Sequence, residues 1–485
     1  MANILFTHSF FYRFDPKQWE VIRQPYPPLM TITAAALMRA EGHEARLFDT
    51  NLRESPEEIM PMLADAPDYL IIYDDGFNWL TKMCLTRMRD AAFELARMGR
   101  EAGATVIICS SDSSDHYEMY LDKGVDYVLL GEGELTLQAL MTAFAERQDI
   151  TTVQGLAFRK EGETVHTGRR GVIRDLDSLP QAAWDLIDVD SYRKVWMEAH
   201  GYFSLNLDTT RGCPYKCNWC AKPIYGNRYN VRDPKLVAEE IEMLMSRYGV
   251  DHFWMCDDIF GLKPGWVHTF RDEVKKRGLK FRYKIQSRVD LMLGDDQIEA
   301  LADTGLETVW VGAESGSQKI LDAMDKGTQV EQIQEATQRL QSHGVRVAFF
   351  LQFGYPGEKE EDIQKTIAMV QQCLPDEIGI SVSYPLPGTK FYERVRDQLG
   401  EKANWVDSDD LDLMFVNEYQ PAFYKKLHRY VHKVHRKAQG WQYLRESLRA
   451  PASLSGSRMK RILSAFYYTP AAWLDARELR KLARS

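Results

Sequence analysis

The first 150 residues alternate short apolar runs with longer stretches in which apolar residues recur every three or four positions. Short apolar runs between polar residues are typical of buried strands, and the periodic stretches are typical of amphipathic helices. The predicted strands are 3–6, 44–48, 69–73, 105–109 and 127–130, and the predicted helices include 29–39, 80–101 and 135–145. This alternation predicts an α/β domain with a doubly wound, Rossmann-like parallel sheet, whose ligands bind at the carboxyl ends of the strands.

A second alternation of strand and helix follows a connector that contains a predicted hairpin at 155–167. Its strands are 205–209, 252–256, 281–286, 308–311, 345–352 and 379–384, and its helices include 234–247, 269–277, 295–303, 331–343 and 360–371. Six βα units predict a partial (βα)6 barrel with its functional groups at the carboxyl ends of the strands. The predicted domains are 1–150, a connector at 151–200, the barrel at 201–398, and a helical basic C-terminal region at 399–485.

Three cysteines in one short loop of the barrel carry the most specific chemistry: Cys213, Cys217 and Cys220, spaced C-x3-C-x2-C. A cubane 4Fe–4S cluster normally takes four thiolates, so three thiolates leave one iron open to a small molecule. The alternatives are a zinc site and a chance cluster. Structural zinc needs a fourth Cys or His at suitable spacing, and none lies nearby in the sequence.

This loop resembles the cluster loop of the radical S-adenosylmethionine (SAM) enzymes, in which the open iron binds SAM. In that family an aromatic residue before the third cysteine packs near the SAM adenine, and Trp219 stands at that position. The resemblance implies that a reductant, flavodoxin or ferredoxin, supplies one electron that cleaves SAM. The radical formed removes hydrogen from an unactivated carbon, while the barrel orients and shields the reacting groups.

Motifs at the ends of the predicted barrel strands extend the resemblance. Residues 312–317, Gly-Ala-Glu-Ser-Gly-Ser, resemble the family's Gly-x-Glu-Ser-Gly-Ser element, and residues 354–358, Gly-Tyr-Pro-Gly-Glu, resemble its Gly-x-Pro-Gly-Glu turn. Each motif alone has a plainer interpretation, as a helix cap, a surface ion pair or a tight turn. The residues that the resemblance implies for SAM are Trp219, Asp257, Asp258, Ser287, Arg288, Gly312, Glu314, Ser315, Gly354 and Pro356.

The domain order resembles the cobalamin-binding radical SAM family, which includes the anaerobic oxidative cyclase of bacteriochlorophyll synthesis and many C-methyltransferases. Residues 127–134 match its Val-x-Gly-Glu-Gly-Glu element. Its Asp-x-His-x-x-Gly loop, which gives cobalt an axial His, is here Asp-Thr-Asn-Leu-Arg-Glu at 49–54. The resemblance therefore predicts a cobalt without a His below it, and the alternative is a vestigial domain that binds substrate or only supports the barrel. The implied cobalamin contacts are Asp74, Ser110, Ser111, Gly131, Glu132 and Gly133.

The composition, 45% hydrophobic and 27% charged, is ordinary for a soluble protein. No apolar run reaches the ~18 residues that a membrane span needs, and the N-terminus lacks the pattern of a secretory signal. Four further cysteines stand in apolar surroundings and are expected to be buried thiols: Cys84, Cys109, Cys256 and Cys373. We therefore expect a reducing, cytoplasmic location.

Charge is distributed unevenly along the chain. Residues 424–485 hold 15 Lys and Arg against three Asp and Glu, whereas the whole chain has a net charge of −9. The first interpretation of this tail is a solvated run of charge, and the alternative, suggested by its basic amphipathic pattern with aromatic residues, is peripheral contact with a membrane surface. Nucleic acid is not expected as a partner, because the acidic body would repel phosphates.

These observations predict an enzyme that uses a 4Fe–4S cluster, SAM and cobalamin to methylate an unactivated carbon of a hydrophobic or amphipathic, lipid-like small molecule. The first alternative is radical oxidation, cyclisation or rearrangement without methyl transfer. The second alternative is a cobalamin- or SAM-binding sensor without turnover. No side chain is assigned as an acid or base of the reaction.

Overall fold

The computed structural model describes residues 1–83, 85–220, 224–294, 296–400, 404–451 and 455–484. The chain divides into two compact units. The first unit comprises Met1–Tyr215, Ala221–Ile285 and Asn404–Asp410, and the second comprises Lys216–Cys220, Gln286–Ala403 and Leu411–Ser485. Cys84, predicted to be a buried thiol, lies outside the described residues.

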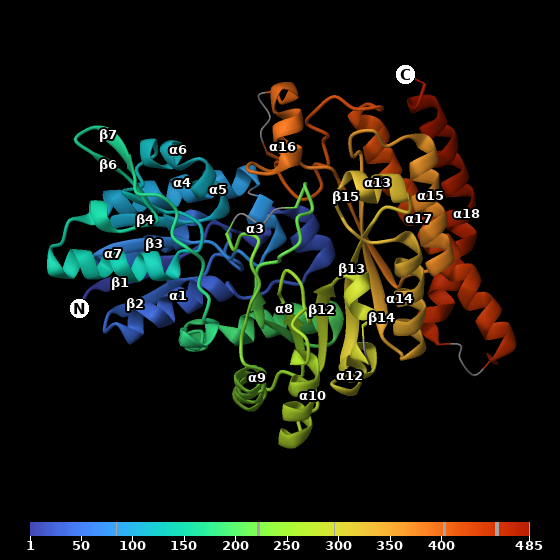
Figure 1. The fold of residues 1–485 in the computed structure, drawn as a ribbon, viewed down its shortest axis with the longest axis horizontal. Coiled ribbons are helices and arrows are strands. Elements are labelled where there is room, and N and C mark those ends of the chain that lie inside the picture. Colours follow the sequence, from blue (N-terminus) through green and yellow to red (C-terminus); the bar gives the residue numbers. More distant parts are fainter. Residues whose placement is uncertain (84, 221–223, 295, 401–403, 452–454, 485) are drawn as a thin grey trace. The chain divides into compact units, whose positions relative to one another are not determined.

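The first unit begins with a seven-stranded sheet in the order β2-β1-β3-β4-β5-β6-β7, with helices on both faces (Figure 1). Its strands are β1 Asn3–Thr7, β2 Glu44–Phe48, β3 Tyr69–Tyr73, β4 Thr105–Cys109, β5 Tyr127–Leu129, β6 Leu156–Lys160 and β7 Glu163–His166. Strands β1 to β5 pair in parallel, and β6 and β7 form the predicted antiparallel hairpin, which extends the sheet beyond β5. The predicted doubly wound sheet is confirmed, and its strand order reverses next to β1, where ligands usually bind.

Apolar side chains explain the packing of the helices on this sheet. Helix α4 turns Ala92 and Leu95 toward the buried side chains Leu70 and Val106 of β3 and β4. A Cβ at Gly99 would lie 2.4 Å from Leu70, so α4 approaches the sheet closely at that glycine. The main helices of the domain are α1 Leu29–Ala40, α2 Met60–Leu63, α3 Trp79–Met83, α4 Thr86–Glu101, α5 Ser111–Asp115, α6 Tyr117–Asp122 and α7 Glu134–Glu146. The single helix predicted at 80–101 is thus α3 followed by α4.

The rest of the first unit holds the connector and the start of the second run of βα units. Strand β11 pairs in parallel with β8 on one side and with β12 on the other. Two short features were not predicted: helix α8 in the connector and the antiparallel pair of β9 and β10. The elements are α8 Val189–His200, β8 Ser204–Leu207, β9 Thr210–Arg211, β10 Asn230–Val231, α9 Pro234–Tyr248, β11 His252–Met255, α10 Trp266–Arg277 and β12 Arg282–Ser287.

The second unit continues the βα units, with β14 paired in parallel between β13 and β15. Its elements are α11 Val289–Met292, α12 Gln297–Asp303, β13 Leu306–Glu314, α13 Gln318–Ala323, α14 Val330–Ser342, β14 Arg346–Phe353, α15 Glu360–Cys373, β15 Glu377–Val382 and α16 Lys390–Val395. The six predicted βα strands are therefore present as β8, β11, β12, β13, β14 and β15. The predicted division into four domains remains a prediction.

Two long helices, α17 Pro421–Arg449 and α18 Gly456–Leu482, form the C-terminal region. Helix α17 packs against α15 and β15, and the side chains of His435 and Gln439 both bond to the carbonyl oxygen of Pro375. None of the helices in the described ranges combines the length and the apolar composition needed to cross a bilayer.

Candidate active site

The three cysteines lie in the loop after β9, and each is half-buried and outside any disulfide. The loop passes from the first unit, which holds Cys213, to the second, which holds Cys217 and Cys220. Gly212 has a φ of +83°, and a Cβ at that position would lie 2.4 Å from the carbonyl oxygen of Arg228. The turn before the first cysteine therefore requires glycine.

Three thiols are a suitable donor set for a cubane, in which each thiolate binds a different iron. Among the described residues, no group of three or more Cys, His, Asp or Glu side chains is gathered closely enough to hold a single metal ion. A cubane spreads its ligands over several irons, so its thiolates stand further apart than the ligands of one ion. The assignment of a cluster to these cysteines therefore rests on their spacing along the sequence and stays a prediction.

Asn218 anchors the part of the loop that lies in the second unit. Its backbone N–H donates to Met324 across 3.0 Å, and its side-chain amide donates to the carbonyl oxygen of Ala323 across 2.7 Å. The hydroxyl of Tyr355 donates to the Asn218 Oδ1 across 2.7 Å. Asn218 was not among the predicted residues, because a polar residue between two cysteines carries no distinctive pattern.

Trp219 supplies the test of whether this part of the chain fits a bound nucleoside. Its Nε1–H is buried and has no acceptor among the described residues. A buried donor without a partner costs about 1–3 kcal/mol, so a ligand acceptor at this position would be stabilising. This observation agrees with the predicted place of the SAM adenine next to Trp219.

Asp257 and Asp258, predicted to contact SAM, follow β11 in the first unit. Asp257 is fully buried and accepts the backbone N–H groups of Thr209 and Thr210 across 2.7 and 2.9 Å. Burial raises the pKa of Asp257 to about 7. Asp258 forms an ion pair with Lys82. Both carboxyl groups therefore have protein partners that fix the ends of β8 and β11.

Lys326 joins several predicted residues of the second unit. Its Nζ lies 2.8 Å from Oε1 of Glu314, and its carbonyl oxygen accepts from the Arg288 guanidinium across 2.9 Å. Burial opposes the charge of Lys326, but the Glu314 carboxylate, with a smaller effect of Cys217, raises its pKa. Arg288 also holds Asp290 through two bonds of 3.0 Å, and the adjacent Ser287 is buried.

The backbone at the end of β13 explains how this ion pair forms. The register of β13 shifts between Gly312 and Glu314, and Glu314 has a φ of +56°. A Cβ at Gly312 would lie 2.4 Å from the Lys326 Nζ, so glycine is needed beside the pair. Ser315 is buried and bonds to the hydroxyl of Thr366 across 3.1 Å. The bulge thus turns Glu314 toward Lys326 and leaves its backbone in a strained conformation.

The turn after β14 holds the remaining predicted SAM residues, Gly354 and Pro356. Gly354 has a φ of +77°, and its N–H donates to Oε2 of Glu358 across 2.6 Å. Its carbonyl oxygen accepts from Asn417 across 2.6 Å. Burial raises the pKa of Glu358 to about 8. Pro356 is half-buried at the tip of the turn.

Arg211, two residues before the first cysteine, lies at the centre of a buried ion network in the first unit. Its Nη1 lies 2.9 Å from Glu132 and 2.7 Å from Glu134, and its Nε lies 3.3 Å from Asp208. Tyr73 donates to the second oxygen of Glu134 across 2.8 Å. Burial, together with the neighbouring Glu134, raises the pKa of Glu132 to about 7. Glu132 was predicted as a cobalamin contact, and its own hydrogen bonds run to Arg211 and to the backbone N–H of Ile173.

The other predicted cobalamin contacts gather at the carboxyl edge of β3, β4 and β5. Asp74 accepts the N–H and hydroxyl of Ser9 across 2.7 and 2.9 Å, and burial raises its pKa. Ser110 caps α5, whereas the buried hydroxyl of Ser111 has no partner among the described residues. A Cβ at Gly133 would lie 2.5 Å from Cys109, whereas Gly131 has room for a Cβ but a φ of +82°. Small residues and an unsatisfied hydroxyl fit a group bound at this edge.

His8 is the histidine at the end of β1, and its ring is engaged by the protein. It is buried, its Nε2 lies 3.0 Å from Asp49, and the Thr50 hydroxyl lies 3.0 Å from its Nδ1. Both ring nitrogens therefore have protein partners. A cobalt without a His below it stays a prediction from the sequence at 49–54.

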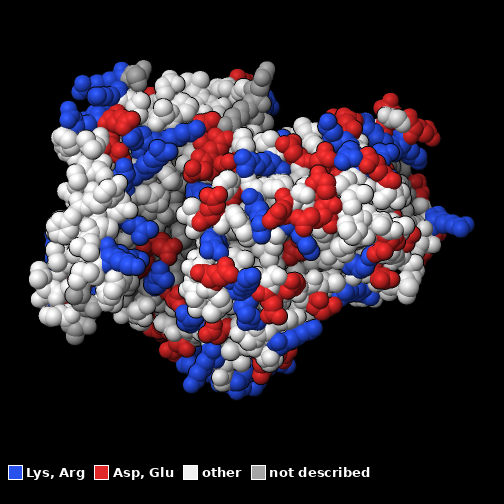
Figure 2. Space-filling view, turned by 180° about the vertical axis from the view of Figure 1, so that it is seen from behind, with Lys and Arg blue, Asp and Glu red and all other residues white. Residues whose placement is uncertain are grey.

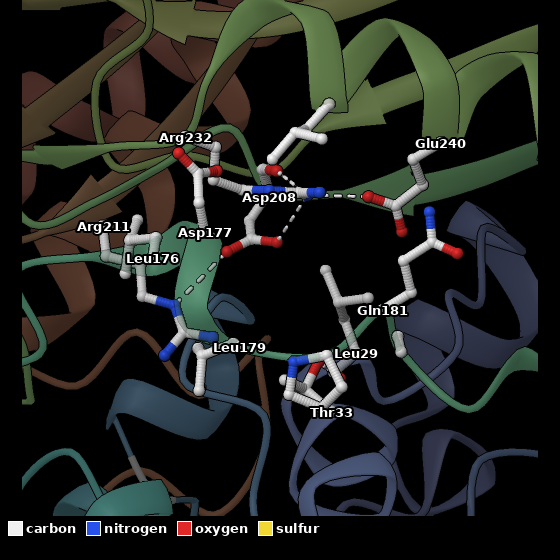
Figure 3. A pocket seen from close by; sticks show the side chains of 13 residues that line it. Leu29, Thr33, Leu176, Asp177, Leu179, Gln181, Asp208, Arg211, Arg232 and Glu240 are labelled. Carbon is white, nitrogen blue, oxygen red and sulfur yellow. Dashed lines mark hydrogen bonds and ion pairs between the residues drawn. The ribbon is translucent and has the colours of Figure 1, made fainter. Parts of the chain in front are cut away.

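A polar cavity of about 190 Å³ lies beside Arg211 in the first unit. Figure 3 shows Arg232 bonded to Glu240 and Asp208 on one wall, with Thr33 on another. The Arg232 Nη1 lies 2.7 Å from Glu240. The charged groups that line the cavity therefore bond to one another.

Residues 207–370, which include the cysteine loop and the ends of β11 to β14, match the Radical SAM superfamily. The chain carries a radical SAM domain. The predicted recognition of this superfamily is thereby confirmed.

Several enzymes share sequence with large parts of the chain. The chain is 28% identical to an uncharacterized methyltransferase of Pyrococcus horikoshii, and the match covers 59% of the chain and 62% of the methyltransferase. The chain is 30% identical to the anaerobic magnesium-protoporphyrin IX monomethyl ester cyclase of Cereibacter sphaeroides, and the match covers 57% of the chain and 45% of the cyclase. Hopanoid C-3 methylase of Methylococcus capsulatus is 23% identical, with 87% of the chain and 79% of the methylase covered. The chain spans about half the length of the first curated relatives that it matches.

Solved structures share the fold of both the radical SAM domain and the preceding sheet. The methyltransferase TsrM of Kitasatospora setae, with cobalamin and a [4Fe-4S] cluster bound, matches the chain with a TM-score of 0.68 and 18% identity. The match covers 82% of the chain and 75% of TsrM. The cobalamin-dependent SAM radical enzyme OxsB, with aqua-cobalamin and SAM bound, matches the chain with a TM-score of 0.71 and 15% identity. The match covers 99% of the chain and 80% of OxsB. The predicted fold class is therefore confirmed.

Proposed function

We propose that this radical SAM chain is a cobalamin-dependent C-methyltransferase that acts on a hydrophobic or amphipathic, lipid-like small molecule. The observation that carries the proposal is the loop with Cys213, Cys217 and Cys220. This loop lies in a radical SAM domain that follows a doubly wound sheet along the chain. When bound, the cluster, SAM and cobalamin supply the electron, the radical and the methyl group.

The chain's own residues hold and orient these groups. The three thiolates would bind the cluster, and the Trp219 N–H offers a donor to the SAM base. Lys326 places a cation beside Glu314 and near Cys217, where it would balance the negative charge of the thiolates, and Arg288 holds the Lys326 backbone through its carbonyl oxygen. The buried side chains at the strand ends exclude water from a reactive radical.

The substrate class rests on the relatives. Hopanoid C-3 methylase aligns with most of the chain and is named for a lipid substrate. We also propose that a flavodoxin or ferredoxin delivers the electron that cleavage of SAM consumes.

A second candidate is radical cyclisation or oxidation without methyl transfer. The identity to the magnesium-protoporphyrin ester cyclases favours it, since one of them is 30% identical to the chain. Both reactions use the same cysteine loop, so the loop does not distinguish them.

Product analysis separates the two candidates. Protein reconstituted without oxygen would be incubated with reductant and SAM whose methyl group is deuterated, with and without cobalamin. Methyl transfer predicts S-adenosylhomocysteine and 5′-deoxyadenosine together, with formation of S-adenosylhomocysteine dependent on cobalamin. If 5′-deoxyadenosine alone forms in both samples, the cyclisation candidate is favoured.

A further inference from the structure

Helix α18 presents a row of large apolar side chains to solvent. Each of these side chains is between 40% and 68% exposed. We call this row the apolar stripe, and its members are Met459, Leu463, Phe466, Tyr467, Trp473 and Leu474. Their spacing of four, three or seven residues places them on one face of the helix, over a length of about 24 Å. Figure 2 shows a broad uncharged surface over the C-terminal helices.

The opposite face of α18 holds the helix to the protein. Ile462, Ala465 and Leu479 are buried there. At Gly440 of α17, a Cβ would lie 2.5 Å from the Cβ of Ala465, so the two helices touch closely. The buried face of α18 is therefore covered by α17, and the apolar stripe is a separate surface.

Charge is segregated between these two faces. Both carboxylates of α18 pair with α17: Asp475 lies 2.6 Å from Lys433, and Glu478 lies 2.5 Å from Lys426. The exposed cations that follow or flank the apolar stripe are Lys460, Arg477, Arg480, Lys481 and Arg484. In Figure 2, Lys and Arg side chains gather at one end of the uncharged surface.

We propose that the apolar stripe of α18 binds the surface of a bilayer that contains anionic lipids. An apolar face with Trp, Phe and Tyr, next to Lys and Arg, is the pattern of a helix that lies in the membrane interface. Lys and Arg next to an anionic surface strengthen such binding. A second copy of the chain fits less well, because it would face the cationic end of α18 with the same charge. This surface does not depend on the proposed chemistry.

The test is co-sedimentation of the reconstituted full-length protein with vesicles of phosphatidylcholine, with and without phosphatidylglycerol. We expect binding to the anionic vesicles that falls as salt is raised. The stripe variant carries Leu463→Ser, Trp473→Ser and Leu474→Ser, and it should bind at least about tenfold more weakly. A matched control changes three exposed apolar residues elsewhere and should bind as the original chain does: Val21→Ser, Met197→Ser and Val416→Ser.

A second variant keeps the apolar stripe and removes cations, with Arg477→Gln, Lys481→Gln and Arg484→Gln. It should lose the preference for anionic over neutral vesicles. The proposal is overturned if the original chain does not sediment with anionic vesicles, or if the stripe variant binds as well as the control. It is also overturned if the stripe variant instead dissociates a dimer in sedimentation velocity without vesicles. Formation of 5′-deoxyadenosine from SAM in solution should be unchanged in both variants, which separates this test from the proposed chemistry.

Discussion

The Nη1 of Arg211 lies 2.7 Å from Oε1 of Glu134, and both groups are buried. The contact joins two motifs that are 77 residues apart in the chain. Glu134 ends the Gly-Glu-Gly-Glu motif of the first sheet, and Arg211 precedes the cysteine loop. The carboxylates of that motif therefore hold Arg211 in place, and with it the backbone just before the first cysteine, within the first unit.

Removing one charge from this network should lower both the stability of the fold and the amount of iron that the cysteine loop binds. Glu134→Gln leaves Arg211 buried with less compensation, so the free energy of unfolding should fall by about 3 kcal/mol. Iron bound per chain should fall as well. The control is Glu94→Gln, which breaks the exposed pair with Arg97 and should cost less than about 1 kcal/mol. Equal losses in the two variants, measured by chemical denaturation, would contradict this role of Arg211.

The cysteines of the loop should differ sharply from the buried cysteines. Cys213→Ala, Cys217→Ala and Cys220→Ala should each abolish the visible absorption of a reconstituted 4Fe–4S cluster, because a cubane held by two thiolates is labile. Cys373→Ala, which changes a buried thiol of α15, should keep the cluster. Full iron and sulfide content in any of the three loop variants would contradict the assignment.

The buried pair of Lys326 and Glu314 gives a third prediction. Lys326→Met should lower the free energy of unfolding by about 3 kcal/mol, because it leaves the Glu314 carboxylate buried without its cation. Adding Glu314→Gln should restore part of that loss. Lys390→Met, at an exposed pair 3.9 Å from Asp325, should change stability by less than about 1 kcal/mol. A Lys326→Met chain as stable as Lys390→Met would show that the pair does not support β13.

The stability of the protein should depend on pH through Glu358. Burial raises its pKa in the folded chain from 4.5 to about 8, so the folded state binds the proton more tightly than the unfolded state. The contribution is fully present below pH 4.5 and is lost as the pH rises to about 8. Glu358→Gln should remove this part of the profile, whereas Glu360→Gln, at an exposed position, should leave it. Thermal unfolding between pH 5 and 9 measures the difference, and parallel profiles for Glu358→Gln and the original chain would refute it.

Cobalt in the bound cofactor should have no protein nitrogen ligand. The ring of His8 is held by Asp49 and Thr50, and residues 49–54 contain no histidine. The electron paramagnetic resonance spectrum of Co(II) cobalamin bound to the protein should be identical for ¹⁵N-labelled and unlabelled chains. A change in the nitrogen splitting on labelling would instead identify a protein ligand.

Local pattern was sufficient to predict most of the sheet. The strands predicted at 44–48, 69–73 and 105–109 coincide with β2, β3 and β4, because short apolar runs between polar residues specify buried strands. The same pattern did not predict β9 and β10, since strands of two residues have no periodicity. It also merged α3 and α4 into one helix, because their apolar residues share a period across the break.

The candidate site was predicted in its residue types but not in its contacts. The spacing of the cysteines and the strand-end motifs was enough to select Glu314 and Arg288, yet Lys326 was missed. Lys326 reaches Glu314 only because β13 has a bulge and Glu314 adopts a positive φ, and a bulge leaves no periodic trace. Arg211 was missed for a similar reason, since Glu132 and Glu134 lie 79 and 77 residues before it in the chain and no local pattern joins them to it.

The central claim is that the three cysteines hold a cluster that cleaves SAM. The most direct test is to reconstitute the original chain and Cys217→Ala without oxygen, add SAM and dithionite, and measure 5′-deoxyadenosine by mass spectrometry. The account predicts that the original chain forms 5′-deoxyadenosine over several turnovers, while Cys217→Ala forms none above the level without protein. Equal amounts from the two chains, or none from the original chain with a full cluster, would contradict it.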